Sequence, residues 1–217
     1  MSATIRKLEP KEIEKAAEMM AFSYIESPSI AAFSKPKNHE TRFKVLKSYF
    51  RILLEQTMRY GKVEAIVLDK ELVGAGMYYP PNQWPVPKVA RIKTSLRVLA
   101  SIGIHIGLKN LLELTNIVSV LEKLHPAQPY YYAQFGCVID KYQKTGIARL
   151  MLENLFQQAD RERVGIYGES SSETNTKIWK KIGFKVVHET NVQGVIYTSL
   201  WREPAALVRR FDNVNIY

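Results

Sequence analysis

Residues 143–148 have the composition of a phosphate-binding turn. Gln143, Lys144, Thr145, Gly146, Ile147 and Ala148 lead from a β-rich run directly into an amphipathic stretch. The first N–H groups of a helix lack partners and the helix dipole adds partial positive charge, so small residues let a pyrophosphate approach the main chain. Lys144 and Arg149 add full charges nearby. The alternative is that Gly146 only eases a strand-to-helix turn.

A second element with polar residues lies further along the chain. Gly168, Glu169, Ser170 and Ser171 end a predicted strand, and Asn175, Trp179, Gly183 and Phe184 follow on a predicted helix and turn. Two such elements at the right spacing arise by chance much less often than either one alone. Together they favour a cofactor site.

The histidines and the cysteine form no metal or nucleophile signature. His39, His105, His125 and His188 are far apart, with neither HxxxH nor CxxC spacing, so no metal site is predicted. The single Cys137 cannot form an intrachain disulfide, and within an apolar strand it is expected to be a buried, inert thiol.

The composition indicates one folded domain spanning residues 1–217. Apolar residues make up 46% and charged residues 24% of the chain, which argues against disorder, a collagen-like fibre or a coiled-coil rod. The net charge of +10 suggests an anionic partner. However, the basic residues are scattered and no RNA-binding or zinc-finger signature accompanies them, so nucleic acid is an unfavoured partner.

No secretory or membrane segment is predicted. Residues 1–8 lack the apolar core and cleavage site of a secretory signal, which indicates a cytoplasmic protein. The most apolar stretch, residues 98–124, is interrupted by five polar residues that are each costly in hydrocarbon, namely His105, Lys109, Asn110, Glu113 and Asn116. A membrane span, and with it a membrane partner, is therefore not expected.

The apolar periodicity predicts the elements that position these motifs. In chain order they are a strand at 3–8, a helix at 10–24, a helix at 39–60 capped by Asn38, strands at 63–68 and 72–79 forming a hairpin, a helical insertion at about 88–124, a strand at 130–139, a helix at 146–163, a strand at 165–170, a helix at 173–182, strands at 184–189 and 194–201, and a tail at about 203–217. The insertion is expected to break between Gly103 and Gly107. The alternation of strands and helices implies an α/β layer with at least one parallel pair.

Residues 130–203 resemble the GCN5-related N-acetyltransferase (GNAT) superfamily, whose members transfer acetyl from acetyl-coenzyme A to an amine. The family's core signature, apolar-x-Val-x-Pro-x-x-Gln-Gly-x-Gly-x-Gly/Ala, is similar to residues 137–148. Its later Leu-Glu-x-Ser, Asn and Tyr-x-x-x-Gly-Phe elements are similar to residues 168–171, Asn175 and residues 179–184. The resemblance implies an α/β (α+β) acyl-CoA N-acyltransferase fold. Its central sheet would be mixed, mostly antiparallel, flanked by helices and splayed between strands 4 and 5, with the helical insertion before strand 4.

The same resemblance implies acetyl-CoA as the cofactor and assigns roles to particular residues. Backbone groups of Cys137 and Val138 would bind the pantetheine arm and polarise the thioester carbonyl. Residues 143–148 would hold the pyrophosphate, and Asn175 would contact the cofactor. The implied reaction is direct attack by a primary amine in a ternary complex.

The region before the fourth strand is similar to the subgroup that contains puromycin N-acetyltransferase. The similarity rests on the helical insertion, on His125 and Pro126, and on the aromatic run of Tyr130, Tyr131 and Tyr132. It implies a small-molecule amine as the acceptor. An aromatic enclosure suits such an amine, and the predicted acceptor-binding residues are Phe22, Tyr79, Tyr130 and Tyr132. The alternative is that these aromatics are core residues.

Four positions depart from the family pattern. Asp140 replaces the usual Pro, Lys144 and Thr145 occupy positions commonly held by Gly and by a basic or polar residue, and Trp179 replaces the Tyr that protonates the departing thiolate. An indole donates a hydrogen bond but cannot act as a titratable acid. Glu169 is the predicted general base, with a purely structural carboxylate as its alternative.

Other functions and partners stay open on the sequence alone. Trp179 permits a catalytically weak, acyl-CoA-binding regulatory module, and the net charge permits a basic nucleic-acid-binding protein. Self-association into a homodimer is also open.

Overall fold

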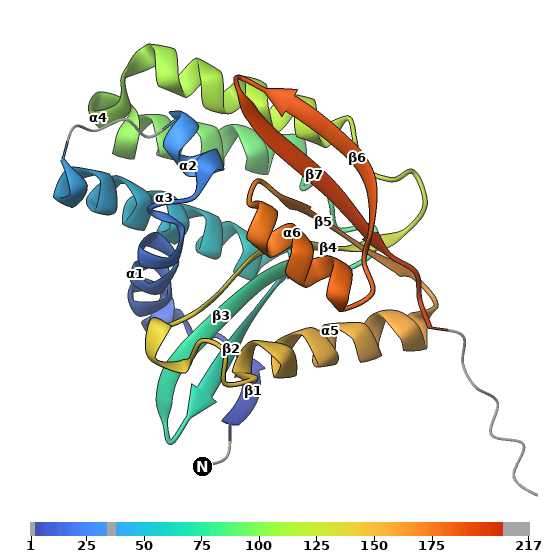
Figure 1. Ribbon diagram of the computed structural model, residues 1–217. Helices are drawn as coiled ribbons and strands as arrows, with labels where there is room; N and C mark the ends of the chain where they lie inside the picture. Colours follow the sequence, from blue (N-terminus) through green and yellow to red (C-terminus); the bar gives the residue numbers. More distant parts are fainter. Residues whose placement is uncertain (1–2, 34–37, 206–217) are drawn as a thin grey trace, which may run out of the picture.

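A seven-stranded sheet lies at the centre of the molecule, in a computed structural model that describes residues 3–33 and 38–205 (Figure 1). Its order is β1-β2-β3-β4-β5-β7-β6. The strands are β1 (Ala3–Lys7), β2 (Lys62–Leu68), β3 (Glu71–Tyr79), β4 (Tyr130–Val138), β5 (Gly165–Ser170), β6 (Lys185–Val192) and β7 (Val195–Arg202). Neighbouring strands are antiparallel except β4 and β5, which are parallel. The mixed, mostly antiparallel sheet implied by the family resemblance is confirmed.

The helices follow the predicted pattern with two local differences. They are the 3-10 helix η1 (Pro10–Glu12), α1 (Ile13–Tyr24), α2 (Pro28–Phe33), α3 (His39–Tyr60), α4 (Lys88–Glu122), the 3-10 helix η2 (Asp140–Tyr142), α5 (Ile147–Glu162) and α6 (Glu173–Lys181). Asn38 caps α3 as predicted, because its side chain accepts a hydrogen bond from Thr41 N at 2.7 Å. The helix predicted from Pro10 begins as a 3-10 turn, and α2 was not predicted because six residues are too few to show a helical period. From residue 206 on, the predicted tail lies outside the described residues.

Helices α1, α3 and α4 cover one face of the sheet, and α5 and α6 cover the other (Figure 1). Successive side chains of a strand point to opposite faces. In β3, Met77 and Tyr79 therefore pack on the side of α3, whereas Tyr78 packs on the side of α5. Because both faces are covered, β3 is buried along nearly its whole length, which explains its unbroken apolar sequence.

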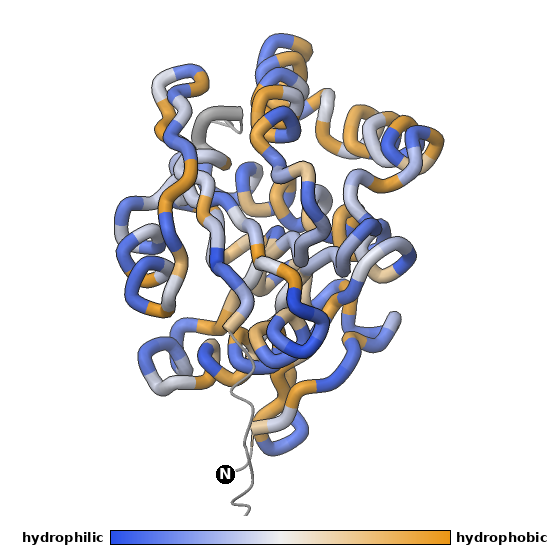
Figure 2. The backbone as a smooth tube through the Cα atoms, turned by 90° about the vertical axis from the view of Figure 1, so that its right-hand side faces the viewer, coloured by the Kyte–Doolittle hydropathy of each residue, from blue (hydrophilic) through white to orange (hydrophobic). Residues whose placement is uncertain are grey.

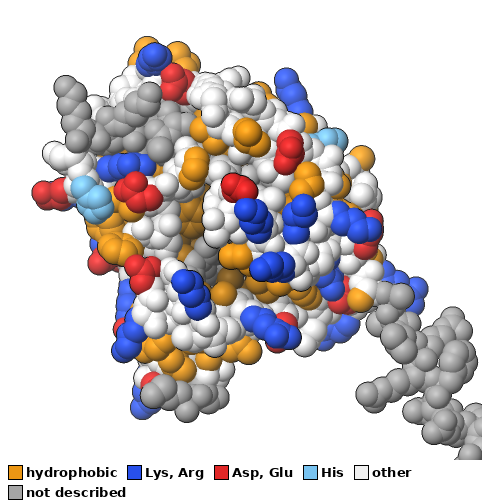
Figure 3. All heavy atoms as spheres, viewed as in Figure 1, with side chains coloured by type: hydrophobic (Ala, Val, Ile, Leu, Met, Phe, Trp, Pro, Cys, Tyr) orange, Lys and Arg blue, Asp and Glu red, His pale blue; other side chains and the backbone are white. Residues whose placement is uncertain are grey.

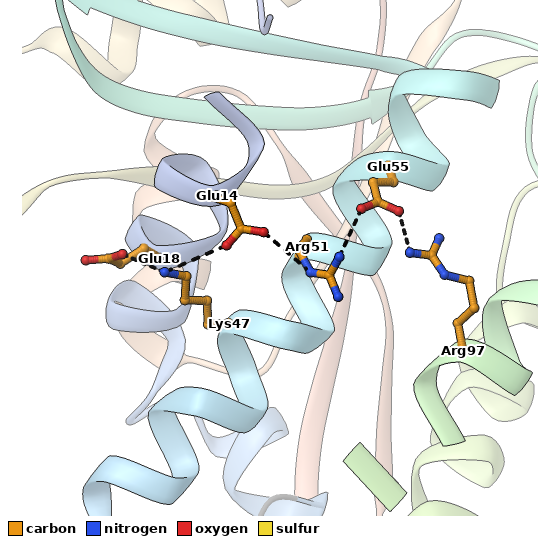
Figure 4. A network of polar contacts seen from close by, with 6 residues as sticks. All are labelled: Glu14, Glu18, Lys47, Arg51, Glu55 and Arg97. Atoms are coloured by element: carbon orange, nitrogen blue, oxygen red, sulfur yellow. Dashed lines mark hydrogen bonds and ion pairs between the residues drawn. The ribbon is translucent and has the colours of Figure 1, made fainter. Parts of the chain in front are cut away.

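A chain of ion pairs joins the three helices α1, α3 and α4 on one face of the sheet (Figure 4). It comprises Glu14 and Glu18 of α1, Lys47, Arg51 and Glu55 of α3, and Arg97 of α4. Lys47 lies 2.8 Å from Glu18, and Arg51 lies 3.4 Å from Glu55. Glu55 also pairs with Arg97, so the first half of α4 is tied to α3. Partly exposed pairs of this kind contribute little to stability individually, but together they link α1, α3 and α4.

The sheet opens between β4 and β5. The two strands pair only from Tyr130 with Gly165 to Ala133 with Gly168. Directly after the last pair, the register of β4 against β3 shifts, which leaves Gln134 as the extra residue of a β-bulge. A bulge bends its strand and increases the local twist, so β4 turns away from β5 at this point. The predicted splay is thus confirmed, and the bulge is its cause.

The insertion before β4 is a helical hairpin. Gly107 has φ 78° and ψ 160°, which interrupts α4 in its middle, and glycine adopts such a positive φ without steric cost. Arg91, near the start of α4, forms an ion pair with Glu122 at its end. The two halves of the helix are therefore folded back on each other, with the break inside the predicted region.

Candidate functional site

The free edge of β4 presents main-chain groups to the opening of the sheet. The N–H and C=O groups of Gly136 both contact the hydroxyl of Tyr24, which accepts from the first at 3.2 Å and donates to the second at 3.1 Å. These groups therefore point away from β3. Main-chain groups of an antiparallel strand alternate in direction, so those of Val138 also point into the opening, where its carbonyl accepts a hydrogen bond from Gln143 Nε2 at 3.2 Å.

Cys137 lies between Gly136 and Val138, and its main-chain N–H and C=O groups point toward β3. It is the register partner of Ala75 on β3, and its side chain is buried in the core formed with α1 and α3. Burial raises the pKa of the Cys137 thiol to about 12, so the thiol is protonated and inert at neutral pH. Of the two predicted pantetheine-binding residues, Val138 has its main chain exposed to the opening, and Cys137 does not.

The predicted phosphate-binding turn connects η2 to α5. Gly146 has a φ of +88° at the N-cap of α5, and a Cβ atom there would meet no atom within 4 Å. No side chain caps α5, and no hydrogen bond within the described residues engages the N–H groups of Gly146, Ile147 and Ala148. These three donors and the open space beside them suit an anion.

The side chains of the turn hold it in place. Gln143 Nε2 donates to Val138 O and, at 2.7 Å, to Asp140 Oδ1, and Thr145 Oγ1 donates to Tyr142 O at 2.7 Å. Gln143 and Thr145 therefore brace the main chain rather than extending toward a ligand. Lys144 is exposed with a φ of 62° and carries the turn's free positive charge.

Basic side chains gather around this turn and α6. Figure 3 shows Lys and Arg side chains spread over the face formed by α5 and α6. Lys180 and Lys181 are exposed on α6, and Arg149 is exposed on α5, where it also pairs with Glu153 at 2.6 Å. The face is therefore positively charged where the free N–H groups lie.

Helix α6 places Asn175 and Trp179 on this same face. Ser172 caps the helix by accepting a hydrogen bond from Asn175 N, and the side chain of Asn175 is exposed. Trp179 is half-buried and packs edge to face on Phe184, with ring centroids 4.5 Å apart. A Cβ atom on Gly168 would lie 2.9 Å from the indole. Trp179 thus covers β5 at the last residue that pairs with β4.

Glu169 lies on the opposite face, in a cage of aromatic residues. Its Oε2 accepts a hydrogen bond from Tyr132 at 2.8 Å, and its Oε1 lies 3.2 Å from His125 Nε2 and 3.3 Å from the Tyr167 hydroxyl. The His125 and Glu169 side chains are only 8% and 11% exposed. Because His125 Nδ1 lies 2.7 Å from the hydroxyl of Tyr130, the network assigns the His125 proton to Nε2, directed at Glu169.

The predicted acceptor-binding aromatics separate into two groups. Tyr79, Tyr130 and Tyr132 belong to one buried aromatic cluster, in which Tyr132 donates to Glu169 and Tyr79 stacks on Tyr132. Burial, followed by the Glu169 charge, raises the pKa of Tyr132 well above its usual value, so its hydroxyl stays protonated. Tyr79 is fully buried, with its hydroxyl 3.0 Å from Thr57 Oγ1. Phe22 lies apart on α1 and is more than half exposed.

Comparisons with known proteins bear on the fold of this chain. No protein-family model matches the sequence, and no curated protein matches it either. Solved structures do match. The chain superimposes on an acetyltransferase from Corynebacterium glutamicum described as a histone acetyltransferase and related acetyltransferase, with a TM-score of 0.70 at 16% identity over 96% of this chain and 99% of that one. It also superimposes on the polyamine N-acetyltransferase of Drosophila melanogaster, with a TM-score of 0.64 at 10% identity over 93% and 100% of the two chains. The chain has the GNAT fold.

A third GNAT-fold structure is the arylalkylamine N-acetyltransferase like 5b of a mosquito, with a TM-score of 0.55 at 17% identity over 93% of this chain and 100% of that one. These identities are low, so the likeness establishes the GNAT fold and leaves the activity to be argued from the site. The puromycin N-acetyltransferase subgroup stays a prediction.

Sequence reasoning missed several residues of the site in this GNAT-fold chain. His125 and Tyr167 complete the cage around Glu169, and the His-Pro sequence at 125–126 was the only signal for the first of them. Six buried side-chain polar atoms have no hydrogen-bond partner among the described residues, and two of them are Gln134 Oε1 and Tyr197 Oη. Buried polar atoms are rarely left unpaired, and Gln134 is the bulge residue at the opening of the sheet.

Proposed function

We propose that the chain is an acetyl-CoA-dependent N-acetyltransferase that acetylates a primary amine of a small molecule. The observation that carries this proposal is the arrangement around Gly168, where β4 and β5 part. Trp179 covers this point from the α6 face, and the Glu169 side chain projects from the next residue on the opposite face. A thioester at the opening of the sheet would therefore have the edge of the Trp179 indole on one side and the Glu169 carboxylate on the other.

The cofactor fits the residues present. The free N–H groups of Gly146, Ile147 and Ala148 would hold the pyrophosphate, with Lys144 as the nearest unpaired positive charge. The main chain of Gly136 and Val138 would bind the pantetheine arm. In the free protein, the hydroxyl of Tyr24 is hydrogen-bonded to the same N–H and C=O groups of Gly136. When bound, acetyl-CoA supplies the activated acetyl group.

Glu169 acts as the general base in this proposal. It takes the proton that the attacking amine nitrogen loses as the new N–C bond forms. Tyr132 and Tyr167 hold the carboxylate in one orientation by donating to its two oxygens. A general base positioned in this way contributes typically about 100- to 10,000-fold to the rate.

His125 would connect Glu169 to solvent. The imidazole also lines a surface depression of about 400 Å³, together with Trp84, Glu122 and Tyr130. His125 therefore stands between the buried carboxylate and a wet surface on the side away from α6. We assign it a positioning and proton-relay role that acts through Glu169.

Trp179 occupies the position from which family members protonate the leaving thiolate. Its indole N–H donates a hydrogen bond, which would stabilise the thiolate without delivering a proton. A thiolate with a pKa near the 8.5 of cysteine is a tolerable leaving group close to neutral pH, so water would protonate it. Transfer should then be slower than with a tyrosine at this position.

The expected acceptor is a small amine with an apolar body. The aromatic side chains beside Glu169 are buried, at 9% exposure or less, and an acceptor with an apolar body would pack against them when it reaches the carboxylate. Two of the GNAT-fold structures that match are amine acetyltransferases, for polyamines and for arylalkylamines. We further propose that the chain belongs to the subgroup of puromycin N-acetyltransferase, because of the His-Pro and aromatic sequence before β4.

A catalytically weak acyl-CoA-binding module is the second candidate, favoured by Trp179. Two measurements separate the candidates. Calorimetry with acetyl-CoA should detect binding in both cases, whereas a thiol-release assay over a library of small amines should give turnover only for an enzyme. Binding without release on any amine would favour the weak module, and no binding at all would contradict both.

A further inference from the structure

Helix α4 carries a row of exposed apolar side chains along its outer side. These residues, called the α4 stripe here, are Val89, Ile92, Leu96, Ile104, Leu108 and Leu112, each more than half exposed and Ile104 as much as 91% exposed. Hydrophobic positions recur along the helices at the top of the molecule, where α4 lies (Figure 2). Within the first half of α4, Val89, Ile92 and Leu96 fall three and four residues apart, which places them on one side of the helix.

The α4 stripe lies in a segment rich in basic residues. From Leu72 to Leu112 the sequence contains no Asp or Glu, and its five basic residues are Lys88, Arg91, Lys93, Arg97 and Lys109. Arg91 and Arg97 pair with Glu122 and Glu55 of neighbouring segments. Lys88 and Lys93 are exposed, and neither forms an ion pair within the described residues. Lys109 pairs with Glu113 at 4.0 Å, so Lys88 and Lys93 are the two of these five basic residues whose charge no ion pair within the described residues neutralises.

By length and hydropathy α4 could cross a membrane, but its packing argues against this. Only 22% of its most apolar window is buried inside the molecule, yet the buried residues Val98, Ile102 and Ile106 belong to the main core. The break at Gly107 and the ion pair between Arg91 and Glu122 fold the helix into a hairpin. One side of α4 is thus held by the protein and the other is apolar and exposed.

We propose that α4 docks this GNAT-fold protein on an anionic lipid surface. A helix with an apolar side and flanking basic residues lies in the interface of a bilayer, with its apolar side chains at the acyl boundary and its lysines at the headgroups. This revises the expectation of no membrane partner. That expectation came from the cost of spanning a bilayer, and a helix that lies on the surface does not bury its polar side.

The charge pattern selects the lipid surface over other occupants. A second copy on the same stripe would bring the unpaired Lys88 and Lys93 of both copies together, with no acidic residue between positions 72 and 112, and like charges facing each other are destabilising. Nucleic acid would leave the apolar stripe uncovered. The docking is independent of the proposed acetyl transfer, so either can fail alone.

The test is sedimentation of the full-length protein with vesicles. Phosphatidylcholine vesicles are compared with vesicles that also contain phosphatidylglycerol. Ile104→Glu places a charge in the α4 stripe, and Lys93→Glu reverses a charge beside it. Val187→Glu on β6 and Lys70→Glu at the β2–β3 turn make the same chemical changes at exposed positions elsewhere. Thermal melting checks that each variant is folded, and Leu96→Glu replaces Ile104→Glu if that one is not.

The protein should sediment with the anionic vesicles and should be released by salt. Lys93→Glu should weaken binding about fivefold or more, at roughly 1 kcal/mol for each basic residue near an anionic surface. Ile104→Glu should weaken it about tenfold or more, and both control variants should bind like the parent. Equal binding of all variants would overturn the proposal. So would a parent dimer that Ile104→Glu dissociates, because a second copy would then cover the stripe.

Discussion

Glu169 and Trp179 approach the same point of the sheet from opposite faces. A Cβ atom on Gly168, the last β5 residue that pairs with β4, would lie 2.9 Å from the Trp179 indole. The next residue directs its carboxylate to the other face, where Tyr132 donates to it at 2.8 Å. The opening of the sheet therefore lies between the benzo edge of the Trp179 indole and a buried carboxylate. The proposed division into a cofactor side and an acceptor side follows from this arrangement.

Replacing Gly146 should weaken cofactor binding. Gly146→Asp adds a negative charge beside the free N–H groups of α5, so acetyl-CoA affinity measured by calorimetry should fall on the order of tenfold or more. Gly194→Asp is the matched control, because Gly194 also has a positive φ, +84°, and open space around its Cβ position. If both variants bind acetyl-CoA like the parent, the turn does not hold the phosphates.

Replacing Trp179 by tyrosine should raise turnover at neutral pH. The phenol would supply the titratable hydroxyl that the indole lacks. Trp179→Phe serves as the control, since it keeps an aromatic ring against Phe184 and Gly168 without any hydroxyl. The pH–rate profiles of the two variants are the readout. Identical profiles with intact cofactor binding would mean that position 179 only packs.

Loss of His125 should slow turnover without changing KM. His125→Gln keeps polar contacts near Glu169 and Tyr130 but cannot relay a proton, so kcat should fall by about tenfold or more. Added imidazole should restore part of the rate through the depression that His125 lines. His188→Gln on β6 is the control, because His188 is exposed. A kcat that falls and does not respond to imidazole would reduce His125 to a packing role.

The Arg6–Glu12 pair should make stability depend on acid pH. Two hydrogen bonds of 2.7 Å from the Arg6 guanidinium lower the pKa of Glu12 to about 2. A lowered folded pKa stabilises the native state above the unfolded value of about 4.3. This contribution disappears as the pH falls toward 2. Glu12→Gln should cost about 1 kcal/mol at pH 7, because Arg6 is partly exposed.

Denaturant unfolding at several pH values measures this effect. The difference in unfolding free energy between the parent and Glu12→Gln should shrink between pH 4.5 and pH 2. Glu71→Gln, which removes an exposed ion pair with Lys15, is the control. A difference that stays constant down to pH 2 would show that the pair does not shift the titration of Glu12.

Periodicity was sufficient to predict most of the fold. The strand at 165–170 is found as predicted, and the long amphipathic helices end within a few residues of their predicted limits. Two features have no signal in hydrophobic pattern. The six residues of α2 are too few for a period, and the bulge at Gln134 depends on how β4 pairs with β3, which is a long-range property.

The site could be predicted only where it is local. The turn at 143–148 can be predicted directly from the sequence, because its binding groups all belong to the start of one helix. The cage around Glu169 could not be predicted, since it joins His125, Tyr132 and Tyr167 through the parallel pairing of β4 with β5. Residue type alone does not show which aromatic side chains meet in the fold, and Phe22 lies apart from Tyr79, Tyr130 and Tyr132.

The most direct test of the account compares Glu169→Gln with the parent in the thiol-release assay on a panel of small primary amines. Glu162→Gln is the matched control, because Glu162 also accepts a tyrosine hydrogen bond at 2.8 Å, from Tyr131. The account predicts that the parent acetylates small amines, that Glu169→Gln lowers kcat about 100- to 10,000-fold with unchanged acetyl-CoA affinity, and that Glu162→Gln does not. A folded Glu169→Gln variant as fast as the parent would contradict it.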